Sequence, residues 1–380
     1  MIDKEVAELR RRFRPDRTAI THYYGCYVNC THEIVSEFDL GQDLGESSEE
    51  QYLKLLKKAV SGKIGKTVFN VSFATKDVAA HTNDEYEMLT RLLKDGFECD
   101  EAAAETRHAF YEAIIAAHNS EDGYIILLAR DAYDVPLKRG KRNDAADESG
   151  DAVHRYFVCA ICPVKGKATD MKYDQGKKYF HIDDVDLYVK APQFGMMFPA
   201  FDDRQTNLYG ALYYAKKKDD VGEGLYHCFF GADAPLCLDE QAARFGAVLK
   251  GAYNKLELET VQAVSANIRE KLDAQKESDD NGPLTLSADT VGDILREYGA
   301  SDSEVAKAEG AFAEQYGSDG TVVASNVVPT KKVRYETPFM KLVLDAEKDG
   351  VISLREMGGR QCLIIDLDGY PLSVNGIDVS

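Results

Sequence analysis

Acidic side chains and one histidine lie at the ends of predicted strands in the middle of the chain. Asp131 and Asp134 follow an apolar run, His181 ends a predicted hairpin, and Asp202 follows an aromatic stretch. Carboxylates together with a histidine can bind a divalent cation, and a bound cation can promote hydrolysis of a phosphate ester. These four residues define one hypothesis, a metal-dependent hydrolase that acts on a phosphate or a nucleotide.

The same residue types also have a purely structural explanation. Aspartate is common in turns because its carboxylate accepts hydrogen bonds from nearby backbone N–H groups. In Asp202-Asp203-Arg204 a carboxylate can also pair with the arginine or with one elsewhere. We prefer this explanation, in which the acids support bends. It predicts no catalytic residue and no cofactor, and it favours a protein that is not an enzyme.

Basic side chains are bunched in short segments, although the chain has a net charge of −19. Such a charge disfavours broad attraction to nucleic acid or to an anionic membrane. Solvated surface charge is the simpler explanation of the bunching, but local basic segments can still contact phosphates, which position a nucleic acid without reading its sequence. The candidate contacts are Arg10, Arg11, Arg12, Arg14 and Arg17 near the start, and Lys138, Arg139, Lys141 and Arg142 in a polar predicted loop.

Two further motifs are explained better by structure than by chemistry. Cys159 and Cys162 have CxxC spacing, but they lie in a predicted buried strand and no second cysteine pair completes a zinc site. We expect them to pack as small apolar side chains. The segment 62–67 contains Gly-Lys-Thr, but it lacks the earlier glycine of a phosphate-binding loop, and a predicted helix precedes it where a strand is required.

The elements that must position these residues indicate an α+β fold. Short apolar runs bounded by Pro, Gly and Asp predict a central mixed sheet with flanking helices, and the motifs at Ser47–Glu50 and Thr82–Glu85 are expected to cap two of these helices. The sheet region is predicted to span residues 1–236, a helical segment 237–317, and a small antiparallel β-meander 318–380, docked on the helices.

No stretch approaches the roughly 18 apolar residues of a membrane span. The charged start lacks the apolar core of a signal peptide, and the eight cysteines show no disulfide framework typical of short secreted chains. We therefore predict a cytoplasmic protein that does not bind a membrane.

Several stretches together resemble a bacterial family known only as a domain of unknown function. The resemblance covers nearly the whole chain and implies no activity, cofactor or catalytic residue. The stretches are GYIILLARDAYDVP (123–136), CAICP (159–163), FGMMFPAFDDR (194–204), ASN (324–326) and the opening ELRRRFRPD (8–16).

In layout alone, the chain is also similar to nucleoid-associated proteins of the NdpA type. Both have an N-terminal α/β part that opens with a strand like 19–22, a strand-rich middle, a helical stretch and a short β tail like 332–367. This resemblance implies a nucleoid-associated role, since those proteins are acidic yet are recovered with DNA, but shared layout does not establish shared function. Our leading hypothesis is thus a non-catalytic binding protein whose partner is nucleic acid or another protein. The metal-dependent hydrolase is the alternative, and the sequence does not define an oligomeric state.

Overall fold

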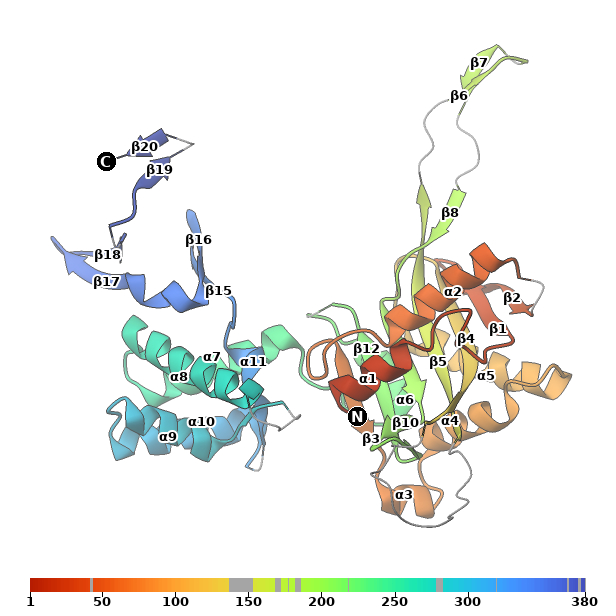
Figure 1. Ribbon diagram of the computed structural model, residues 1–380, viewed down its shortest axis with the longest axis horizontal. Coiled ribbons are helices and arrows are strands. Elements are labelled where there is room, and N and C mark those ends of the chain that lie inside the picture. The colour runs from red at the N-terminus through yellow and green to blue at the C-terminus, as the bar shows by residue number, and fades with distance from the viewer. Residues whose placement is uncertain are drawn as a thin grey trace, which may run out of the picture. The chain divides into compact units, whose positions relative to one another are not determined.

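A computed structural model describes residues 1–41, 44–136, 153–167, 172–176, 178–181, 186–217, 219–277, 283–318, 320–367, 369–374 and 377–379. The chain divides into two compact units, Met1–Cys237 and Leu238–Ser380, and each is described by itself (Figure 1). Helices account for 39% and strands for 30% of the protein, which confirms the α+β class.

The first unit contains the large sheet, its flanking helices and two small hairpins. Its elements are α1 (Asp3–Arg10), β1 (Tyr23–Val28), β2 (Ile34–Leu40), α2 (Glu46–Ala59), β3 (Val68–Ser72), α3 (Thr75–Ala79), α4 (Asp84–Asp95), α5 (Glu101–Ala117), β4 (Tyr124–Asp134), β5 (Val153–Lys167), β6 (Lys172–Asp174), β7 (Tyr179–His181), β8 (Asp186–Val189), β9 (Phe194–Phe198), β10 (Ala200–Asp202), β11 (Gln205–Asn207), β12 (Gly210–Ala215) and α6 (Glu223–Phe230).

The large sheet has eight strands in the order β2-β1-β4-β5-β9-β12-β3, and β8 pairs with the outer part of β5. We expected a mixed sheet, but every pairing of its named strands among the described residues is antiparallel. The reason lies in the connections: β1 and β2, and likewise β9 and β12, are joined through described residues without a crossover helix, and direct links of this kind join antiparallel strands.

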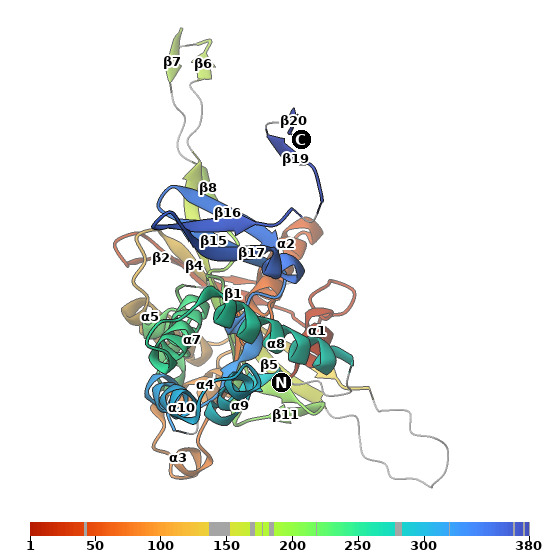
Figure 2. The same ribbon diagram turned by 90° about the vertical axis from the view of Figure 1, so that its left-hand side faces the viewer.

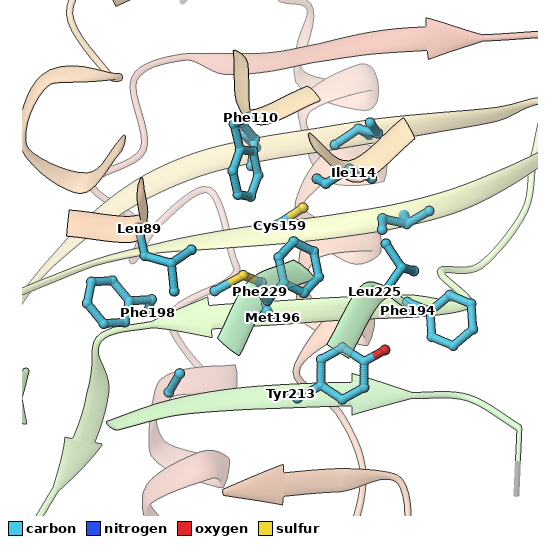
Figure 3. Close-up of a cluster of buried hydrophobic side chains, with 14 of the residues drawn as sticks. Leu89, Phe110, Ile114, Cys159, Phe194, Met196, Phe198, Tyr213, Leu225 and Phe229 are labelled. Atoms are coloured by element: carbon cyan, nitrogen blue, oxygen red, sulfur yellow. The ribbon is translucent and has the colours of Figure 1, made fainter. Parts of the chain in front are cut away.

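Both faces of the sheet are buried, because its strands alternate their side chains between two apolar layers. On one face, side chains such as Ile126 and Cys159 pack with α4, α5 and α6, as Figure 3 shows for Leu89, Phe110 and Phe229. The opposite face packs with α1 and α2. The sheet is therefore the middle layer of three, and each helical layer presents its outer side to solvent.

Helix starts follow the expected chemistry only in part. The motif Ser47–Glu50 does not cap α2, which begins earlier, after Gly45, so Ser47 lies within the first turn. At α4 the cap is Asn83, whose side chain accepts a hydrogen bond from the Tyr86 N–H, and not Thr82. Both predicted capping boxes were therefore wrong in detail, although both helices form.

The second unit contains helices and small β elements. These are α7 (Leu238–Ala252), α8 (Leu258–Glu277), β13 (Thr285–Leu286), α9 (Ala288–Glu297), α10 (Asp302–Tyr316), β14 (Val322–Val323), α11 (Ala324–Val327), β15 (Lys332–Thr337), β16 (Met340–Asp345), the 3-10 helix η1 (Ala346–Val351), β17 (Ile352–Met357), β18 (Arg360–Ile365), β19 (Leu372–Val374) and β20 (Ile377–Val379). Its core is formed by α7–α10 and residues of β13, β14 and α11.

The hairpin β15–β16, with η1 and β17, lies beside α8 in both views (Figures 1 and 2). The Gln262 side chain on α8 donates to the Tyr335 hydroxyl (2.9 Å) and to the carbonyls of Asp349 and Ile352 (2.9 and 3.0 Å). Arg269 forms an ion pair with Asp349 at 3.2 Å. These contacts satisfy buried polar groups and hold this part of the tail on the helix.

No helix in the described part of the chain is long and apolar enough to cross a membrane.

Candidate nucleic-acid interface

The helices α1 and α2 and the turn after α1 cover one face of the sheet in the first unit. Val6, Leu9 and Phe13 are spaced to lie on one side of the first segment, and all three are buried. In α2, Leu53 and Leu56 likewise lie on one side of the helix, and both are buried. Burying these apolar side chains fixes both segments, and this determines where the basic residues between them can reach.

Arg12 is committed to the interior and is not an outward-facing cation. Its Nε and Nη2 lie 3.2 and 3.1 Å from the two oxygens of Asp131, whose side chain is 1% exposed. The same carboxylate accepts the Ala19 N–H at 2.7 Å and the Tyr156 hydroxyl at 2.9 Å. Burial, together with this carboxylate, raises the pKa of Tyr156, so its hydroxyl stays a donor. Arg12 therefore fastens the first segment to β4.

A second ion pair ties α1 to the hairpin β10–β11. Asp203 and Arg204 have positive φ angles of 45° and 58°, as a two-residue turn of this hairpin type requires. The turn places the Arg204 Nη1 3.0 Å from both oxygens of Glu8. The Tyr133 hydroxyl donates to Glu8 at 2.5 Å, and burial and this bond raise the pKa of Tyr133 to about 12. This network is neutral overall and supports the fold.

A shallow basic groove lies between the turn after α1 and the exposed side of α2. It has a volume of about 360 Å³ and is lined by Arg14, Lys54 and Lys57 over an apolar floor that includes Phe13 and Leu53. Among the described residues, none of the three cations forms an ion pair with a carboxylate. Asp16 and Glu50 complete the lining. We call this site the α1–α2 groove.

The other candidate contacts lie outside this groove. Arg10 is half-buried at the end of α1, Arg11 is exposed beside it, and Arg17 forms a surface ion pair with Asp16 at 3.5 Å. The second candidate set, Lys138, Arg139, Lys141 and Arg142, falls outside the described residues. Of the first set, Arg14 is thus the residue that the fold places in a groove with other cations.

The candidate metal ligands are used in other ways. Both oxygens of Asp131 bind Arg12 and neighbouring donors, Asp134 is exposed at the end of β4, and Asp202 accepts a hydrogen bond from the Asn207 amide at 3.4 Å. His181 ends β7, and its side chain lies outside the described residues. In the described part of the chain, no group of three His, Cys, Asp or Glu side chains could hold a metal ion.

The CxxC cysteines cannot act as a pair. Cys159 packs in the layer under α4–α6 and Cys162 in the layer under α1–α2, because residues three apart on a strand face opposite sides. Burial raises the pKa of both thiols, that of Cys162 to about 12. Both are free thiols that pack in the core, as the sequence indicates.

Sequence reasoning missed Lys54 and Lys57, because it looked for runs of adjacent basic residues. Their signal is helical: residues three apart lie on the same side of a helix, and both fall within a segment that the sequence already predicts to be helical. Their approach to Arg14, 40 and more positions away in the sequence, had no local signal.

Comparison with known proteins gives a family without an assigned activity. The chain belongs to the family described as Domain of unknown function (DUF4317), whose model matches residues 1–377. A search of curated proteins finds no match to the chain.

Proposed function

We propose that this member of the DUF4317 family is a non-catalytic binding protein that holds the phosphate backbone of a nucleic acid in the α1–α2 groove. The observation that carries the proposal is the convergence of Arg14, Lys54 and Lys57 on one groove without carboxylate partners among the described residues. Lysine and arginine side chains arranged in this way neutralise phosphates and release counterions, which is the main source of sequence-independent affinity.

Local charge supports the proposal despite the overall charge of −19. The segments 1–17 and 46–66, which contain α1 and α2, carry eleven basic and seven acidic residues, a net charge of +4. Two of those acids, Glu5 and Glu8, point inward or pair with groups of the sheet. The outer side of this layer therefore carries a more positive net charge than the +4 counted from the sequence.

The form of the groove favours backbone contact over base recognition. The groove offers three cations, which can bind phosphate oxygens, and its other charged side chains are the carboxylates of Asp16 and Glu50. Phosphate contacts position a nucleic acid and carry little sequence information. We therefore expect weak dependence on sequence.

The test is equilibrium binding of a short DNA duplex, and of an RNA strand, at about 50 mM salt, where electrostatic contacts are strong. Changing Arg14, Lys54 and Lys57 together to glutamine should weaken binding at least about tenfold, because three phosphate contacts are lost. The matched control changes Lys250, Lys255 and Lys307, exposed lysines of the second unit, to glutamine. It removes the same charge and should change binding by less than about twofold.

Two outcomes would contradict the proposal. One is no measurable binding of either nucleic acid by the unmodified protein at low salt. The other is an equal loss of affinity in the groove variant and its control, which would show that only net charge matters. Circular dichroism and thermal unfolding of both variants would exclude a folding defect, since all six side chains are at least partly exposed.

A further inference from the structure

A thiol, an imidazole and a phenol meet on the first unit, on the side away from the α1–α2 groove. The exposed Cys99 has its Sγ 3.6 Å from the Nε2 of His22 and 3.8 Å from the Tyr24 hydroxyl. Cys99 directly precedes Asp100, the N-cap of α5, and His22 directly precedes β1. Two elements that are fixed by packing thus bring the three groups together.

The histidine is oriented for proton exchange with the thiol. Its Nδ1 lies 3.1 Å from the Thr21 hydroxyl, and its ring stacks on Tyr24 with centroids 5.8 Å apart and planes 20° apart. With Nδ1 engaged, Nε2 is the nitrogen that faces Cys99. Tyr24 donates its hydroxyl proton to the Phe97 carbonyl at 3.2 Å, and burial raises the pKa of Tyr24, so it remains a neutral neighbour.

A buried cation beside this cluster lacks a carboxylate partner. Arg107 is 7% exposed, and its Nη1 donates to the carbonyls of Gly96 and Glu98 at 2.8 and 3.1 Å. Its guanidinium lies 4.1 Å from the centre of the Tyr24 ring. Within the described residues no carboxylate forms an ion pair with it. A buried charge without a counter-charge is costly, so an anion nearby is favourable. The N-terminus of α5 acts in the same direction.

We infer that Cys99 is a nucleophilic thiol, with His22 as its proton acceptor, and that it forms mixed disulfides with small disulfides. In the step, the Cys99 proton moves to the His22 Nε2, and the thiolate attacks one sulfur of the small disulfide. A new S–S bond forms to Cys99, the original S–S bond breaks, and the second sulfur leaves as a thiolate.

The other thiols provide the comparison within the chain. Cys26, Cys159 and Cys162 are buried, and a buried thiol in apolar surroundings is inert. Cys30 is exposed like Cys99, but in the described part of the chain it forms no hydrogen bond with a histidine. It is therefore the matched control for exposure without an imidazole partner.

The experiment uses the folded, full-length protein and 5,5′-dithiobis(2-nitrobenzoate), an anionic aromatic disulfide whose leaving thiolate is coloured. We expect one fast equivalent of released thiolate, absent in Cys99→Ser and retained in Cys30→Ser. His22→Gln should slow this phase about tenfold or more, because the proton acceptor is lost. Peptide mapping after treatment with less than one equivalent of reagent should place the label on Cys99.

The result that overturns the inference is labelling of Cys30 as fast as Cys99, or a Cys99 rate that stays within about twofold in His22→Gln. The buried thiols of Cys26, Cys159 and Cys162 show whether that variant is folded, since they should stay unreactive in both proteins as long as the core is intact. His22→Asn serves as a second variant if the first unfolds. In denaturant, where the cluster does not exist, the rate advantage of Cys99 over Cys30 should disappear.

Discussion

The two faces of the first unit's sheet carry helical layers of opposite charge. The layer with α1 and α2 has a net charge of +4, from eleven basic and seven acidic residues in the segments 1–17 and 46–66. On the other face, the segment 75–117, which contains α3–α5, has four basic and ten acidic residues, a net charge of −6. Each layer also has a groove, and the side chains that line each groove have the same sign of net charge as the layer.

The groove between α4 and α5 has a volume of about 550 Å³ and is lined by Asp84, Glu87 and Glu105 together with Arg91. The α1–α2 groove is lined by three cations and two acids. One sheet therefore presents a basic side and an acidic side. The total charge of −19 describes neither side. The distribution of charge predicts that a polyanion approaches from the basic side.

The two faces also differ in how their helices are held. On the α4–α6 face the contact is mostly aromatic, as with Phe110 stacked on Phe229 at 5.9 Å (Figure 3). On the α1–α2 face, two ion pairs, Arg12–Asp131 and Glu8–Arg204, add to the apolar contact. The basic layer is thus held in part by two ion pairs, in which each charge is balanced by its partner. The cations that line the α1–α2 groove face outward.

The largest effect should come from breaking the Arg12–Asp131 pair. Asp131→Ala leaves Arg12 without its carboxylate and removes the acceptor of Tyr156, so we expect a loss of about 3–5 kcal/mol in the free energy of unfolding. Urea denaturation measures it. The control is Asp134→Ala, three residues away and exposed, which should change the free energy by less than about 0.5 kcal/mol. Equal effects of the two changes would contradict the structural role of Asp131.

The pH dependence of stability should involve one histidine on each face. Burial lowers the pKa of His118 and that of His154 to about 4, whereas an unfolded histidine has a pKa near 6.5. Between these values the unfolded chain binds more protons, so stability is lost as the pH falls from about 6.5 to 4, by at most about 3 kcal/mol for each residue. Urea denaturation across this range, with His118→Gln and His154→Gln separately, should show a shallower loss in each variant. An unchanged slope in both would show that neither buried imidazole controls it.

The smallest effect should come from the acidic groove. Changing Asp84 to asparagine and Glu87 and Glu105 to glutamine reduces the negative charge of the layer opposite the proposed α1–α2 binding groove, and salt screens most of its repulsion of a nucleic acid in that groove. We expect DNA affinity to rise by no more than about threefold at low salt. A rise as large as the loss caused by the α1–α2 groove variant would mean that net charge alone controls binding and that the two faces are equivalent.

Local pattern was enough to predict most elements and not enough to predict the contacts between them. β15 and β16 have the bounds that alternation and turn residues indicate, because a hairpin is defined by neighbours in sequence. The Arg12–Asp131 pair joins positions 119 apart, and Cys99 meets His22 across 77. Such contacts depend on which strands lie next to one another in the sheet, and this order is not a local property of the sequence. The sequence places Asp131 after an apolar run, where we expected the end of a strand, but β4 continues to Asp134, so Asp131 lies inside the strand and its buried carboxylate pairs with Arg12.

The most direct test of the central proposal is the salt dependence of DNA binding. The slope of log K against log salt should be less steep by about 2–3 in the protein with Arg14, Lys54 and Lys57 changed to glutamine, since each phosphate contact contributes about 0.9 on duplex DNA. The control with Lys250, Lys255 and Lys307 changed should keep the slope of the unmodified protein. The same slope in all three proteins would contradict the assignment of the α1–α2 groove as the place where phosphates bind.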